Sequence, residues 1–159
     1  MADVPTGGGA PGIDITWVLD AAREDVWREW TEPEAFADWY GGPDMHVPHE
    51  TVAMDVRAGG RWSLVMRGLG REIHWNGEYV EVEPPERLAF TVSDRPGEDL
   101  YDLCTVVLRD LGDGRTEMHF TQTGSQPAEV YRRASEGWSG FFARIAERLA
   151  ASNPTKETE

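Results

Sequence analysis

The sequence of 159 residues has a single cysteine, Cys104, so it cannot build a disulfide-bonded scaffold. It has no apolar run near the ~20 residues that a membrane-spanning helix needs. Its first twelve residues show neither the basic start nor the apolar stretch of a signal peptide. We therefore expect a cytoplasmic protein that does not enter the membrane.

Basic residues are scarce, with 15 lysines and arginines against 29 aspartates and glutamates, and the net charge is −14. Such a surface repels DNA and RNA unless it carries a concentrated basic patch, and the densest basic spot is the pair Arg132–Arg133. The sequence also lacks a nucleophile elbow, a Walker A loop and a dinucleotide-binding fingerprint. We expect no nucleic-acid partner and no cofactor, and we assign no catalytic residue.

Aromatic residues are plentiful: seven Trp, four Tyr and five Phe. Large aromatic side chains either fill a core or line a cavity, and composition alone does not separate the two. The polar or glycine-rich ends predict disordered tails at residues 1–12 and 152–159. One domain is therefore expected over residues 13–151.

The first part of this domain predicts one strand followed by two short helices. Ile13–Asp20 alternates apolar and polar residues with a period of two, which is typical of a strand. Arg23–Thr31 changes to helical spacing, with Asp20 as its expected N-cap. Pro33–Trp39 predicts a second short helix with proline in its first turn.

Six strands and a long helix are expected next. Glycine and proline turn signals join the strands by short hairpins, which predicts an antiparallel sheet. The helix, about Pro127–Ala151, is amphipathic and long enough to cover that sheet. The pattern predicts an α+β fold in which a curved sheet of about seven strands grips one helix. The six expected strands are Thr51–Arg57, Arg61–Arg67, Glu72–Val82, Arg87–Ser93, Leu103–Arg109 and Thr116–Thr123.

Several short motifs occur along residues 13–150 in an order that resembles the family named after the activator of Hsp90 ATPase. This family belongs to the START/Bet v 1-like superfamily, which has the helix-grip fold. The motifs are Asp20-Ala21-Ala22, Val26-Trp27-x-x-Trp30-Thr31-x-Pro33, Trp39-Tyr40-Gly41, Asp55-Val56-Arg57-Ala58-Gly59-Gly60-Arg61-Trp62, Trp75-x-Gly77-x-Tyr79, Pro84-Pro85-Glu86-Arg87-Leu88-x-Phe90-Thr91, Gly114-x-Thr116 and Glu136-Gly137-Trp138.

This resemblance implies a deep, largely apolar cavity between the sheet and the long helix. Members of the wider superfamily bind lipids, polyketides and other hydrophobic small molecules. Some members are aromatase/cyclases, and a few relatives protect antibiotic producers from their own product. The eukaryotic co-chaperone has a further domain that engages the chaperone, and we expect no room for it in this chain.

Our leading interpretation is a non-enzymatic protein that binds a hydrophobic, aromatic or polyketide-like small molecule. In one version of this interpretation, the protein sequesters a toxic molecule as part of antibiotic self-resistance. Two glycines in the long helix, Gly137 and Gly140, would leave room for such a ligand, although close packing of helix on sheet would also explain them. The expected ligand contacts are Trp30, Trp39, Trp62, Leu64, Met66, Trp75, Tyr79, Phe90, Phe120, Trp138 and Phe142.

Two alternatives remain open at this point. One is a polyketide cyclase/dehydratase-like enzyme in the same cavity, which would need an inward group of tyrosine, histidine, arginine or aspartate. The other is a co-chaperone-like interaction module. We expect no metal, because His46, His49 and Glu50 have no further ligands nearby. Cys104 is expected to be a small buried hydrophobe.

Overall fold

The computed structural model describes residues 12–41, 44–94 and 101–151. The predicted tails therefore lie outside the described residues, except that Gly12 begins the first strand. No helix in the described ranges is long and apolar enough to cross a membrane.

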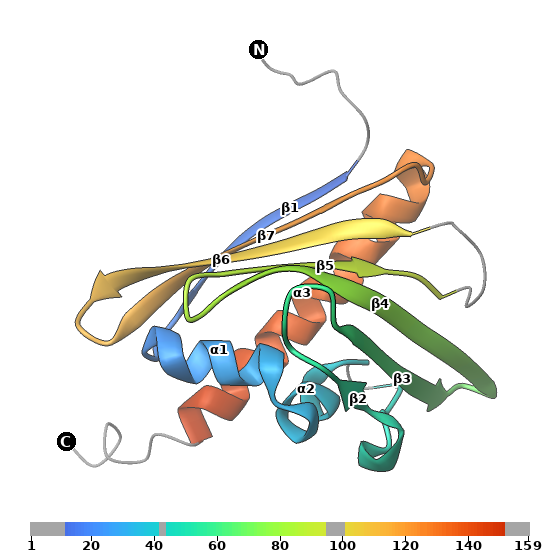
Figure 1. The fold of residues 1–159 in the computed structure, drawn as a ribbon, viewed down its shortest axis with the longest axis horizontal. Coiled ribbons are helices and arrows are strands. Elements are labelled where there is room, and N and C mark those ends of the chain that lie inside the picture. Colours follow the sequence, from blue (N-terminus) through green and yellow to red (C-terminus); the bar gives the residue numbers. More distant parts are fainter. Residues whose placement is uncertain (1–11, 42–43, 95–100, 152–159) are drawn as a thin grey trace.

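Seven strands form one antiparallel sheet in the order β1-β7-β6-β5-β4-β3-β2, which confirms the predicted α+β helix-grip architecture. The long helix α3 crosses one face of this sheet, and the two short helices lie beside its C-terminal half (Figure 1). The elements are β1 (Gly12–Leu19), α1 (Arg23–Thr31), α2 (Pro33–Trp39), the 3-10 turn η1 (His49–Thr51), β2 (Ala53–Met54), β3 (Arg61–Gly68), β4 (Arg71–Glu83), β5 (Arg87–Val92), β6 (Asp102–Gly112), β7 (Arg115–Thr123) and α3 (Ala128–Ala151).

The core lies between α3 and the face of the sheet that the period-two pattern makes apolar. Alternate residues of the central strands are buried there, as on β6, where Cys104, Val106 and Leu108 alternate with more exposed neighbours. α3 faces them with side chains spaced three or four residues apart, including Trp138 and Phe142. Burying one such large side chain contributes roughly 1.5–3 kcal/mol to folding.

Two sequence predictions about local structure are wrong. The expected strand Thr51–Arg57 is instead the η1 turn and the two-residue strand β2. Its second half turns back on itself, because the amide of Arg57 bonds to the carbonyl of Asp55 instead of to a neighbouring strand. The N-cap of α1 is Ala22, not Asp20, and the Ala22 carbonyl accepts the first bonds of the helix.

A glycine in the middle of β4 permits one close approach. A Cβ at Gly77 would overlap both the carbonyl oxygen of Thr91 and the indole Nε1 of Trp62. Without that Cβ, the Trp62 indole donates to the Thr91 carbonyl at 3.0 Å. This explains the glycine of the Trp75-x-Gly77-x-Tyr79 motif in terms of packing.

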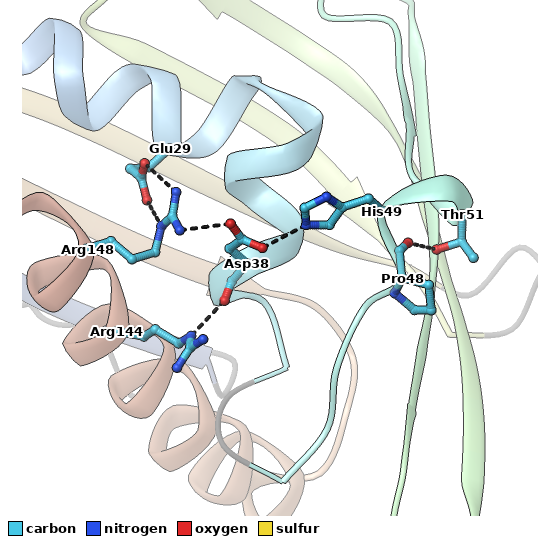
Figure 2. A network of polar contacts seen from close by, with 7 residues as sticks. All are labelled: Glu29, Asp38, Pro48, His49, Thr51, Arg144 and Arg148. Carbon is cyan, nitrogen blue, oxygen red and sulfur yellow. Dashed lines mark hydrogen bonds and ion pairs between the residues drawn. The ribbon is translucent and has the colours of Figure 1, made fainter. Parts of the chain in front are cut away.

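A polar network joins the short helices to the long one (Figure 2). On α3, the Nε and Nη2 atoms of Arg148 donate to both carboxylate oxygens of Glu29 at 2.7 and 3.3 Å, while its Nη1 donates to Asp38 at 2.9 Å. The other carboxylate oxygen of Asp38 bonds to His49 Nε2 at 2.7 Å, and its backbone carbonyl accepts from Arg144. The network thus fixes α2, whose C-cap residue is Tyr40.

Candidate ligand-binding site

The centre of the helix–sheet interface is filled with aromatic rings. Trp30 is fully buried, and its ring centroid lies 4.8 Å from that of Trp39 and 6.0–6.2 Å from those of Phe120, Phe142 and Trp138. The void left beside it measures only about 10 Å³, which is at most one water molecule. The deep cavity that the family resemblance implies is therefore largely closed in this protein.

An apolar pocket of about 150 Å³ remains at one end of this interface, and we call it the aromatic pocket. Tyr40 forms part of its wall, with ring centroids 6.2 Å from Trp75, 5.8 Å from Trp138 and 5.1 Å from Phe141. Its lining comes from the end of α2, from four strands and from α3: Tyr40, Met66, Trp75, Val92, Gln122, Ala134, Gly137, Trp138 and Phe141.

Gly137 is the glycine of α3 that borders the aromatic pocket. A Cβ built at Gly137 meets no heavy atom within 4 Å, and the same holds for Gly140 one turn later. Only Gly137 belongs to the lining of the aromatic pocket. Of the two helix glycines that we expected to leave room for a ligand, Gly137 borders the pocket and Gly140 does not.

A second hollow of about 270 Å³ adjoins the aromatic pocket and shares Trp75, Val92, Gln122 and Ala134 with it. Its further lining includes two acids, Asp94 and Asp102, which we call the acidic rim. The two hollows thus lie on either side of shared wall residues, and only the second has acidic residues in its lining.

A chain of hydrogen bonds holds the polar side of this site. The indole Nε1 of Trp138 donates to Oε1 of Gln122 at 2.8 Å, and Nε2 of Gln122 donates to Asp102 at 2.8 Å. The hydroxyl of Tyr131 also bonds to Asp102. Gly124 permits this arrangement, because a Cβ there would overlap the Asp102 carboxylate. Asp102 is therefore held in place although it is buried.

One polar atom in the wall has no partner. The indole Nε1 of Trp75 is the buried side-chain nitrogen or oxygen without a hydrogen bond among the described residues. Buried donors in folded proteins are nearly always paired, so an unpaired one calls for a reason. Trp75 lines both hollows, which makes an acceptor on a bound molecule one such reason.

The reactive groups near the site are held in their protonated forms. Burial raises the pKa of the Tyr40 hydroxyl well above its usual value, and the negative charge of Asp94 adds to the shift. Burial and the charge of Asp102 likewise raise the pKa of the Cys104 thiol. At neutral pH, Tyr40 can donate a hydrogen bond but is a poor base, and the Cys104 thiol is a poor nucleophile.

The eleven residues expected to contact a ligand fall into three groups. Met66, Trp75 and Trp138 line the aromatic pocket. The other eight fill the space that we expected to be open. Of these, Trp30, Trp62, Tyr79 and Phe90 surround the 10 Å³ void, and Trp39, Leu64, Phe120 and Phe142 are buried core residues that line neither hollow.

Other residues weighed from the sequence lie at the surface or outside the pocket. His49 pairs with Asp38, and the described residues contain no group of three or more histidine, cysteine, aspartate or glutamate side chains arranged to hold a metal ion. Cys104 is buried on the inner face of β6, as predicted.

Sequence reasoning missed Gln122, Asp102 and Asp94 as site residues. A signal for two of them was present. Gln122 continues the inward alternation of Met118 and Phe120 on β7, and Asp102 precedes the inward Cys104 by two residues on β6. A polar residue in phase with a buried apolar series indicates a polar group facing the interior.

Comparisons with known proteins agree with this fold. The family model described as "Activator of Hsp90 ATPase homolog 1-like protein" matches residues 20–150. A crystal structure of a protein from Chromobacterium violaceum is 25% identical, with a TM-score of 0.77, covering 87% of this chain and 96% of that one.

Two more distant structures show the same fold. The AHSA1 protein from Silicibacter pomeroyi is 22% identical with a TM-score of 0.78, covering 89% of this chain and 99% of that one. An Hsp90 activator from Plasmodium falciparum is 18% identical with a TM-score of 0.69, covering 89% and 97%. A search of curated proteins gave no match.

Proposed function

The chain belongs to the family of Activator of Hsp90 ATPase homolog 1-like proteins, and we propose that it binds a small hydrophobic molecule with one aromatic ring in the aromatic pocket. The observation that carries this proposal is the pocket itself, about 150 Å³ of mainly apolar space between α3 and the sheet. A dry apolar cavity of about 150 Å³ is large enough for a benzene-sized ring. In such an apolar site, a small number of polar groups fixes the orientation of the ligand and gives specificity.

The ligand of this proposal also carries a hydrogen-bond acceptor, such as a phenol or carbonyl oxygen. Its partner is the indole Nε1 of Trp75, which is otherwise unpaired among the described residues. Providing this acceptor would remove the cost of a buried, unsatisfied donor. The rings of Tyr40, Trp138 and Phe141 would enclose the ligand on the other sides.

Size argues for a one-ring ligand over a fused, polyketide-like one, which would have to extend into the adjoining hollow of about 270 Å³. Binding without chemistry suits sequestration, including protection of a cell against an aromatic product of its own. We place this function in the cytoplasm, where reducing conditions keep a lone thiol such as Cys104 unpaired.

The test is a titration of the full chain with 4-methylphenol, which has one ring and one oxygen, followed by calorimetry and tryptophan fluorescence. We expect saturable binding by the native protein. Gly137→Leu places a side chain in the pocket and should weaken binding at least ten-fold. Gly140→Leu is the matched control, because a Cβ at Gly140 also meets open space but this residue lies outside the pocket lining.

Two results would contradict the proposal. One is the absence of saturable binding by the native protein. The other is equal binding by both leucine variants, because the ligand would then occupy a different place.

A further inference from the structure

We propose that the ligand is an arylalkylamine, in which a short chain joins the aromatic ring to a protonated amine. This inference rests on the proposed function and adds the sign of the ligand's charge to it. The ring would occupy the aromatic pocket, and the ammonium group would lie at the acidic rim of Asp94 and Asp102.

The charged residues in the described lining of the two hollows are all acidic. Among the described residues that line the two hollows, Asp94 and Asp102 are charged, and none is arginine, lysine or histidine. Opposite charges attract more strongly in a partly desolvated site than in water, so the site favours a cation and disfavours a carboxylate.

Both acids stand close to the apolar part of the site. The charge of Asp94 contributes to the raised pKa of Tyr40, which lines the aromatic pocket. Asp102 is bonded to Gln122, which lines both hollows. A molecule whose ring lies beside Tyr40 therefore needs only a short chain to bring an amine to these carboxylates.

The aromatic walls favour the same class of ligand. The faces of Trp and Tyr rings attract cations, most strongly where water is excluded. Trp75 lines both hollows, so its ring is within reach of a group bound in either of them. The start of α3 acts in the opposite direction, since a helix N-terminus favours anions. That partial charge is weaker than two full carboxylates, so the cation preference remains.

A matched series of ligands tests the charge. Tyramine, tyrosol and 3-(4-hydroxyphenyl)propanoate share one phenol ring and differ mainly in a positive, neutral or negative end group at pH 7. Their affinities for the full chain would be measured from the seven tryptophan indole N–H signals in NMR spectra. We expect tyramine to bind at least ten-fold more tightly than tyrosol, and the propanoate to bind more weakly than tyrosol.

Variants locate the effect. Asp94→Asn and Asp102→Asn should each reduce the advantage of tyramine over tyrosol at least three-fold. Glu24→Gln on α1 removes the same charge from an exposed position and should leave the advantage unchanged. A variant that misfolds is recognised by the loss of dispersion of its indole N–H signals. The other acid variant then still tests the inference.

The outcomes separate this inference from the proposed function. Tyramine preference that depends on the rim acids supports it. Equal binding of the three ligands, or tighter binding of the propanoate, would overturn the inference that the ligand carries an amine. If 4-methylphenol still binds, the proposed function is kept. Failure of 4-methylphenol and of all three ligands to bind overturns both.

Discussion

The indole Nε1 of Trp138 donates a hydrogen bond to Oε1 of Gln122, and this bond fixes which end of the Gln122 amide faces Asp102. With its oxygen committed to Trp138, the amide can present only its NH₂ group to the carboxylate. A residue of α3 thereby determines how a strand residue presents its amide to the polar side of the site.

Replacing this glutamine tests the chain of bonds. Gln122→Met removes the acceptor of Trp138 and one donor to the buried Asp102, so we expect a loss of roughly 1–3 kcal/mol in the free energy of unfolding. Urea denaturation measures it. Gln126→Met is the control, since Gln126 takes part through its backbone amide, and it should change stability by less than about 0.5 kcal/mol. Equal effects of the two variants would contradict the role of Gln122.

Arg148 gives a second prediction. Arg148→Met leaves the Glu29 carboxylate, whose side chain is 10% exposed, without its cation. We expect a loss of roughly 2–3 kcal/mol, below the ~3–5 kcal/mol of a fully buried pair because Arg148 is 31% exposed. Adding Glu29→Gln should restore part of it.

Its matched control is Arg132→Met, on the same helix. The Arg132 side chain is 61% exposed and pairs with Glu129. A surface pair of this kind contributes about 0–1 kcal/mol. Equal losses of stability by the two arginine variants in thermal or urea unfolding would show that the Arg148 network stabilises the fold no more than a surface ion pair does.

Gly77 gives a third prediction. In Gly77→Ala, the new Cβ would overlap the Thr91 carbonyl, and this atom belongs to the backbone and cannot move aside alone. We expect destabilisation near the upper end of the roughly 1–3 kcal/mol range for overpacking. Gly140→Ala is the opposite case, with open space around the Cβ, and should stabilise α3 by up to ~1 kcal/mol. Calorimetric unfolding of both variants checks the two signs.

His49 gives a prediction about pH. The hydrogen bond to Asp38 raises the pKa of His49 above its usual value of 6.5, and the charges of Asp38, Glu34 and Glu50 act in the same direction. Folding therefore favours the protonated imidazole. Its contribution to stability is complete below pH 6.5 and is lost as the pH rises through the higher folded-state pKa.

The measurement is an NMR titration of His49 together with urea midpoints of the native protein and His49→Gln. The native protein should lose its advantage over His49→Gln as the pH rises from 5.5 to 8.5. Asp38→Asn should move the His49 pKa back toward its usual value. A native titration midpoint at or below 6.5 would show that the bond to Asp38 does not stabilise the imidazolium.

Most of the fold could be predicted from periodicity. The bounds of α1 and α2 agree with the sequence prediction, and Met118 and Phe120 lie on the inner face as their spacing indicates. The Thr51–Arg57 prediction failed because a strand depends on pairing with a neighbour, and the backbone turns at Asp55 before that pairing can continue. Local alternation carries no information about that turn.

The site was harder to predict than the fold. Spacing places Trp30, Phe120 and Phe142 in the interior, but it does not reveal that their rings meet and close the cavity. That outcome depends on ring orientations set by three separate elements. Trp138 and Met66 do line the remaining space, together with Gly137.

The position of α3 after all seven strands has a consequence for the synthesis of the protein. As the chain leaves the ribosome, the sheet and both short helices emerge before the helix that covers their apolar face. β1 must also wait for β7, with which it pairs across about a hundred residues of chain. Until α3 has emerged, Trp30 and Phe120 remain exposed to water, so the partly synthesised domain is prone to aggregation and can complete its core only when this helix packs on the sheet.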